Sequence, residues 1–196
     1  MQKSTMAYPP PPSPPPPASP PTSTPKINRK TMLAVGVIVI IVVAIVVGVI
    51  LATRGGGGGG GNGGNVAGAS SLQFSADVTS GGTLTTYTYS VKNIGTSNAM
   101  FRIEWTGNEG NTIYIVNGAQ KQVWIYTDGE WSNFSDYFSD YWSEWNSTFT
   151  GFRDTLATHW SGSGDYTYTD PSTGDTVRFY NISVNPSLAD SLFQHS

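Results

Sequence analysis

The sequence predicts a single transmembrane helix followed by a β-rich α+β domain, in which an antiparallel, sandwich-like sheet packs against one long aromatic amphipathic helix. Three observations predict this arrangement. Residues 32–52 form an uncharged apolar run, short alternating runs recur between residues 72 and 127, and large aromatic side chains recur at helical spacing from residue 131 to residue 160. We therefore divide the chain into a tail at 1–31, a membrane span at 32–52, a linker at 53–68 and an outer domain at 69–196.

The tail at 1–31 is rich in proline, with 11 of the 13 prolines of the chain and almost no large apolar side chains. Such a composition cannot bury a hydrophobic core, so we expect a disordered cytoplasmic tail. Runs such as Pro9 to Pro12 favour the extended polyproline II helix, which aromatic-lined grooves of other proteins recognise. The tail is thus either a semi-rigid spacer or a ligand for a cytoplasmic polyproline-binding protein.

The apolar run at 32–52 contains 21 residues without a charged side chain. As a helix it would reach about 30 Å, the thickness of the hydrocarbon core of a bilayer. Its length, and the proline-rich tail before it, argue against a cleavable signal peptide. Lys26, Arg29 and Lys30 precede the run, whereas only Arg54 follows it closely. Because basic flanks remain in the cytoplasm, we expect a single-pass protein of the cell membrane with its N-terminus inside and its C-terminal domain outside.

The segment after the span predicts a flexible linker, because residues 55–65 are almost entirely glycine. From Arg54 onward the chain holds six Lys and Arg residues against 13 Asp and Glu residues. This negative balance argues against a nucleic acid as partner, since phosphates require a basic surface. The chain has no cysteine, which excludes a disulfide scaffold and a cysteine nucleophile.

Short runs in which apolar and polar residues alternate predict antiparallel strands in the first half of the outer domain. Such alternation places one face of a strand on a core and the other toward solvent. The favoured Asn-Gly turn at Asn117-Gly118 predicts a hairpin between the last two runs. The expected strands contain Leu72 to Val78, Leu84 to Val91, Phe101 to Trp105, Thr112 to Val116 and Gln122 to Thr127.

Residues 70–127 resemble a known family. The segments at 91–95 (VKNIG) and 116–123 (VNGAQKQV), with strands around them, are similar to immunoglobulin-like adhesion modules of prokaryotic surface proteins, of the cell-adhesion-related bacterial domain type. The resemblance implies a β-sandwich with a binding or spacing role and no catalytic residues to carry over. The sequence departs from that pattern after Asp128, where further strands are expected and an aromatic segment appears instead.

Between residues 131 and 160, aromatic side chains recur every three or four residues, which predicts one amphipathic helix, kinked at Gly151. We expect its aromatic face to pack on the sheet as core. The alternative is a partner-binding surface, which would then comprise Trp131, Trp142, Trp145 and Trp160. The whole stripe consists of Trp131, Phe134, Phe138, Trp142, Trp145, Phe149, Phe152, Leu156 and Trp160.

The chain returns to β structure after this helix. Residues 166–169 and 176–184 are expected to pair as a hairpin across the Asp, Pro and Gly residues of 170–175. Ser187 and Asp190 are expected to cap a short terminal helix that carries Leu188 and Leu192.

The outer domain has few residues suited to catalysis. His159 and His195 are the only histidines of the chain, and neither lies in a motif for nucleophilic or metal catalysis. Paired carboxylates can arise from distant positions, so acids such as Glu104 and Glu109 keep a surface hydrolase open as an alternative. No catalytic residue and no cofactor are predicted.

Three acids, Asp136, Asp140 and Glu144, recur every fourth residue within the predicted helix. Carboxylates stacked in this way are a candidate site for a hard cation such as Ca²⁺. Their stripe points away from the aromatic stripe, however, so we expect them to face water, and no metal site is predicted.

Asn133, Asn146 and Asn181 each begin the Asn-x-Ser/Thr pattern of N-glycosylation acceptors. All three fall in the part of the chain predicted to lie outside the cell. They are candidate glycosylation sites, which agrees with the predicted orientation.

Together these observations predict a membrane-anchored surface protein whose outer domain acts as a binding, adhesion or envelope-assembly module. Its expected partners are the lipid bilayer and a protein or glycan at the cell surface. The alternative is a transmembrane scaffold or sensor that recruits a cytoplasmic protein through the proline-rich tail.

Overall fold

The computed structural model describes residues 65–107, 110–171 and 173–195. The predicted tail, the predicted span and residues 53–64 of the predicted linker lie outside the described residues. No helix in the described part of the chain is long and apolar enough to cross a membrane.

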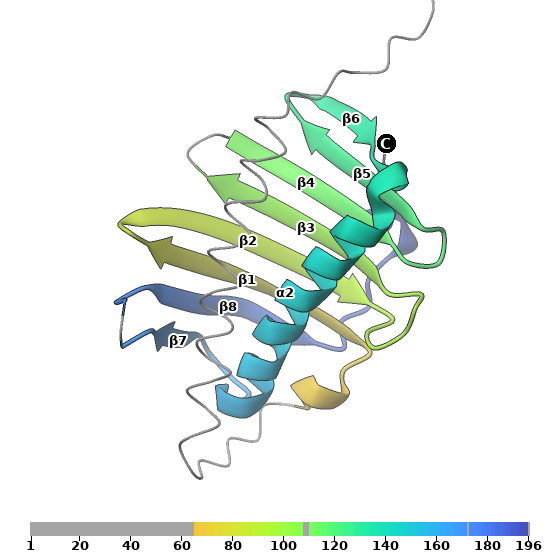
Figure 1. The fold of residues 1–196 in the computed structure, drawn as a ribbon. Helices are drawn as coiled ribbons and strands as arrows, with labels where there is room; N and C mark the ends of the chain where they lie inside the picture. The colour runs from red at the N-terminus through yellow and green to blue at the C-terminus, as the bar shows by residue number, and fades with distance from the viewer. Residues whose placement is uncertain (1–64, 108–109, 172, 196) are drawn as a thin grey trace, which may run out of the picture.

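Within the described residues, eight antiparallel strands form one sheet, which is the main element of the folded domain (Figure 1). Their order across the sheet is β6-β5-β4-β3-β2-β1-β8-β7. The first six strands follow one another as neighbours, and the last two pair on the opposite side of β1. The strands are β1 (Ser71–Ser80), β2 (Thr83–Lys92), β3 (Met100–Gly107), β4 (Gly110–Asn117), β5 (Gln122–Thr127), β6 (Glu130–Asn133), β7 (Tyr166–Thr169) and β8 (Thr176–Val184).

One long helix, α2 (Phe138–His159), lies diagonally across one face of this sheet and carries the chain from the β6 edge to the β7 edge (Figure 1). The expectation of an antiparallel sheet packed against one aromatic helix is thus confirmed. A sandwich would have a second sheet on that face, and in the described residues the helix occupies this position instead.

The helix begins later than predicted, because residues 131–133 belong to strand β6 and not to the helix. Asp128 and Gly129, with φ of 54° and 88°, form a two-residue turn that pairs Thr127 with Glu130. Asp-Gly is among the strongest signals for such a hairpin turn. A short 3-10 helix, η2 (Ser135–Tyr137), then leads into α2, which continues through Gly151 as a single helix.

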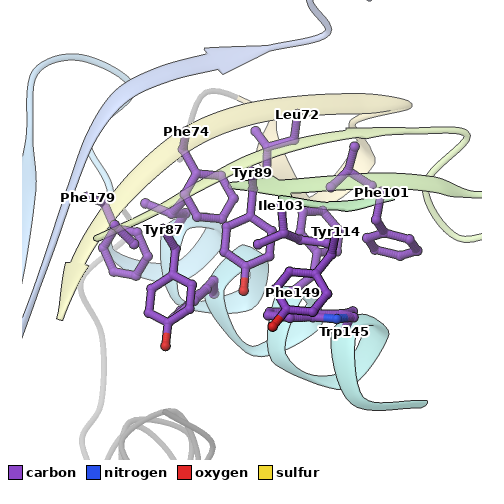
Figure 2. Packing of buried hydrophobic residues seen from close by; sticks show 14 of the residues in the cluster. Leu72, Phe74, Tyr87, Tyr89, Phe101, Ile103, Tyr114, Trp145, Phe149 and Phe179 are labelled. Atoms are coloured by element: carbon purple, nitrogen blue, oxygen red, sulfur yellow. The ribbon is translucent and has the colours of Figure 1, made fainter. Parts of the chain in front are cut away.

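The core lies between α2 and the sheet and is largely aromatic. Phe149 and Phe152 of the helix pack on Phe74 of β1, with ring centroids 6.4 Å and 6.1 Å away. Tyr89 of β2 contacts the same two rings, and Figure 2 shows Phe74 and Tyr89 pointing toward the helix. Aromatic pairs in these geometries add to the hydrophobic stabilisation of the core.

The ends of the folded domain differ from the predictions at two places. Val66 is fully buried in a 3-10 turn, η1 (Val66–Gly68), that contacts α2, so packed structure begins before residue 69. The predicted terminal helix is a 3-10 helix, η3 (Asp190–Phe193), that begins after Ala189 without a side-chain cap. Asp190 forms an ion pair with Lys92 of β2 instead of capping with Ser187.

The predicted hairpin at Asn117-Gly118 is present between β4 and β5. Asn117 pairs with Gln122, so its loop contains four residues. The side-chain oxygen of Asn117 accepts a hydrogen bond from the Gln120 backbone N–H at 3.1 Å, and this side-chain-to-backbone bond closes the loop.

Candidate functional site

The sheet face opposite α2 carries a second group of large side chains, on strands β4 to β6. Successive residues of a strand point to opposite faces. Val123 and Ile125 are buried on the helix side, so Trp124 and Tyr126 project from the other side. Trp131 of β6 pairs directly with Tyr126 and therefore lies on the same outer face.

Residues 187–195, which we call the C-terminal strap, lie against this outer face. Figure 1 shows the C-terminus beside β5 and β6. Arg102 of β3 donates a hydrogen bond from Nη1 to the backbone oxygen of Leu192 at 3.3 Å. Phe193 is buried under the side chain of Lys92, whose Nζ lies 4.9 Å from the ring centroid. Apolar burial and polar contacts thus hold the strap on the sheet.

Between the strap and the strands lies a groove of about 660 Å³. This volume falls within the roughly 300–1,000 Å³ that is typical of small-ligand sites. We call it the aromatic groove. Its lining residues are Arg102, Ile113, Tyr126 and Trp131 from the sheet and Ser187, Leu188, Ala189, Ser191, Leu192 and Gln194 from the strap.

The aromatic rings of the groove have a defined geometry. The rings of Tyr126 and Trp131 are 5.2 Å apart between centroids, with 51° between their planes. Trp131 also contacts His195 at the end of the strap, at 6.4 Å and 65°. Both groove aromatics are partly exposed and stand on paired strands, so they form a preorganised platform.

The groove is close to electrically neutral. Arg102 is the one charged residue among the described residues that line it. Its Nε donates a hydrogen bond to Glu104 Oε1 at 2.7 Å, and its Nη1 donates to the backbone oxygen of Leu192 in the strap. The remaining polar groups of the lining, on Ser187, Ser191 and Gln194, are uncharged. The arrangement therefore combines aromatic faces with neutral donors and acceptors.

The four tryptophans predicted as an alternative binding surface occupy different environments. Trp145 and Trp160 are buried in the core, and Trp160 Nε1 donates to the backbone oxygen of Gly164 at 2.9 Å. Trp142 is partly buried on the helix side, where it contacts Phe101. Trp131 alone of the four reaches the aromatic groove.

Tyr126, Arg102 and the strap are groove residues that the sequence analysis missed. The alternation of Gln122 to Thr127 did contain a signal, because it places two aromatic residues, Trp124 and Tyr126, on the face opposite Val123 and Ile125. The turn at Asp128-Gly129 would have extended that pattern into β6. No local signal indicates that the strap crosses these strands.

The three candidate glycosylation sites, Asn133, Asn146 and Asn181, all lie at exposed positions. Asn133 ends β6, where its side-chain oxygen accepts a hydrogen bond from the Ser135 backbone N–H at 2.8 Å. Asn146 lies on α2, and Asn181 lies in β8 with a φ of 53°.

The acids that the sequence offers as cation ligands or catalytic groups are dispersed in the structure. Asp136 and Asp140 are exposed, whereas Glu144 is partly buried, and this burial raises the pKa of its carboxyl group. Glu104 is paired with Arg102, and Glu109 lies outside the described residues. Within residues 65–107, 110–171 and 173–195, no three His, Asp or Glu side chains gather as a metal site would require.

Several tyrosine hydroxyl groups are enclosed on the helix side of the sheet. Burial raises the pKa of Tyr87, Tyr89 and Tyr114 above the ordinary tyrosine value. The hydroxyl group of Tyr89 has no hydrogen-bond partner among the described residues. The three tyrosines belong to the packed core and lie on the face opposite the aromatic groove.

Comparison of the chain with models of protein families, with characterised proteins and with solved structures finds no match. The function is therefore inferred from the sequence, the fold and the groove.

Proposed function

We propose that this chain is a single-pass membrane-anchored surface protein whose outer domain binds a partner at the cell surface through the aromatic groove. The uncharged run at 32–52 and the cations before it support the anchor and its orientation. The role is a binding, adhesion or envelope-assembly function.

The observation that carries the proposal is the convergence of two distant parts of the sequence on one groove. Tyr126 and Trp131 stand on neighbouring strands, and the strap closes the other side. Aromatic side chains with few rotatable bonds supply contact area at low entropic cost, and they dominate many binding surfaces. A partly open groove with such rings needs little reorganisation on binding.

A binding assay with cell envelopes tests the proposal. The full chain in phosphatidylcholine nanodiscs is incubated with envelopes from the source cells, and the bound fraction is measured. Trp131→Ala is expected to lose most of the binding, whereas Tyr137→Ala, which removes an aromatic ring outside the groove, is expected to retain it. Equal binding by the wild type and both variants would contradict the proposal.

The predicted orientation has its own test. Protease added to intact cells is expected to remove the outer domain and to spare the tail. Protection of the C-terminal domain from that protease would contradict a surface location.

A scaffold or sensor role through the tail remains a second candidate function, because 11 prolines lie in the first 31 residues. This role predicts that the tail alone retains a cytoplasmic protein in a pull-down. Replacement of Pro9 to Pro12 and of Pro14 to Pro17 by alanine is expected to release that protein, since both runs that favour the polyproline II helix are then lost.

A further inference from the structure

We propose that the ligand of the aromatic groove is a neutral carbohydrate, bound with a sugar ring against Trp131 and Tyr126 and its hydroxyl groups toward the strap. This inference rests on the proposed binding function and adds the chemical class of the ligand. It follows from three properties of the groove: its charge, the placement of its polar groups and its aromatic faces.

The charge of the groove argues for a neutral ligand. The guanidinium group of Arg102 already has a carboxylate partner, Glu104, at 2.7 Å. A phosphate or carboxylate ligand would compete with that ion pair for the only cation among the described lining residues. A cationic ligand would meet Arg102 and no acid among the lining residues.

The polar groups of the groove argue for a ligand with many hydroxyl groups. Ser187, Ser191 and Gln194 line the strap side with hydroxyl and amide groups that both donate and accept hydrogen bonds. A purely apolar ligand, such as an acyl chain, would remove these groups from water without replacing their hydrogen bonds, which is unfavourable.

The aromatic side of the groove provides the complementary apolar surface. A pyranose ring has one face of C–H groups, which packs on the electron-rich face of an aromatic ring, while its hydroxyl groups project around the rim. Tyr126 and Trp131, with centroids 5.2 Å apart and planes at 51°, offer two such surfaces at an angle. A chain of linked sugars can contact both.

The experiment uses the full chain in phosphatidylcholine nanodiscs, because many detergents carry sugar headgroups that would compete. The protein is produced in a host that does not glycosylate asparagine, so that no attached glycan reaches the groove from Asn133. The probes are three neutral hexasaccharides, of β1,4-linked glucose, β1,4-linked N-acetylglucosamine and β1,4-linked mannose. Binding is measured by calorimetry and by saturation transfer from protein to sugar protons.

At least one hexasaccharide is expected to bind, and Trp131→Ala or Tyr126→Ala is expected to weaken it roughly tenfold or more. Trp131→Phe keeps a flat ring and should retain most of the affinity. Trp131→Leu keeps apolar bulk without a ring and should lose it. Tyr137→Ala is the matched control and should bind as the wild type does. Thermal unfolding of each variant shows whether a loss reflects the groove or the fold.

The inference is overturned if none of the three hexasaccharides binds, or if Trp131→Leu binds as tightly as the wild type. A hexaproline peptide and dodecanoate serve as competing probes, and Trp131-dependent binding of either one in place of the sugars also overturns it. These results leave the proposed function intact if the envelope assay still depends on Trp131. An envelope assay insensitive to Trp131 contradicts the proposed function itself.

Discussion

His195 stacks on Trp124, with ring centroids 3.5 Å apart and 13° between the ring planes. This contact joins the end of the strap to strand β5, where Trp124 pairs with Ile115 of β4. Because Trp131 lies at 6.4 Å from the same imidazole ring, the strap and the groove aromatics form one connected cluster. The position of the strap therefore determines the shape of the groove.

Removal of the imidazole ring should loosen the strap. We expect His195→Ala to lower the free energy of unfolding by about 0.5–1.5 kcal/mol, the usual contribution of an aromatic pair. Hydrogen exchange of residues 187–195 should become faster, since fewer contacts then oppose local opening. Ser191→Ala, an exposed change in the same strap, is the control. Unchanged exchange in His195→Ala would show that the stack does not hold the strap.

The helix side of the domain should depend strongly on Trp145. Its ring is buried and contacts Tyr114 at 4.9 Å and Tyr89 at 6.3 Å between centroids. Trp145→Ala leaves a large cavity, so we expect a loss of about 3–5 kcal/mol in denaturant unfolding. Tyr137, with 45% of its surface exposed, is the control, and its change to alanine should alter stability by less than about 0.5 kcal/mol. Similar unfolding midpoints for the two variants would contradict the core assignment.

Gly118 should not tolerate a side chain. A Cβ at this position would lie 2.4 Å from the Ser97 carbonyl oxygen and 2.7 Å from the Trp142 ring. Gly118→Ala is therefore expected to cost about 1–3 kcal/mol of stability, as overpacking typically does. Ala119→Ser, at the exposed neighbouring position, should have almost no effect. Thermal unfolding measures both, and a fully stable Gly118→Ala would mean that the loop and α2 are not in contact there.

Alkaline pH should destabilise the domain through its enclosed tyrosines. Burial raises the pKa of Tyr87, Tyr89 and Tyr114 in the folded state. Their hydroxyl groups ionise more readily in the unfolded chain, whose tyrosine pKa is near 10. The stabilising contribution is thus complete below about pH 10 and is lost as the pH rises above it.

Denaturant unfolding between pH 8 and 12, with tyrosinate absorbance recorded in parallel, checks this expectation. Tyr89→Phe removes one ionisable hydroxyl group and should reduce the alkaline loss of stability. An alkaline loss of the same size in Tyr89→Phe and in the wild type would exclude a contribution from Tyr89.

Glycosylation of the three acceptor asparagines should report both the exposure of their side chains and the side of the membrane on which the domain lies. In a host that glycosylates exported Asn-x-Ser/Thr sites, Asn133→Gln, Asn146→Gln and Asn181→Gln should each remove one glycan mass from the full chain. All three side chains are exposed, so the folded domain has room for the modification. A chain without any glycan in that host would argue that the domain stays on the cytoplasmic side.

The sequence by itself predicted most of the β structure. The alternation of Tyr166 to Thr169 and of Thr176 to Val184 matches β7 and β8, because period-two patterning is a property of a short segment. The aromatic stripe from Trp145 to Leu156 likewise identified the buried face of α2, because a spacing of three or four residues is also a property of a short segment. The spacing of apolar residues within a segment is enough to predict a strand or helix when one face of that element packs on the core.

Only the tertiary structure decided which large side chains lie outside that core. Trp131 fits the helical spacing of the stripe, yet pairing with β5 places it in a strand on the other face of the sheet. The strap contacts Trp124 and Arg102, although no sequence pattern near residue 190 predicts these contacts. Contacts between residues far apart in the sequence depend on the whole sheet, and periodicity within one segment carries no information about them.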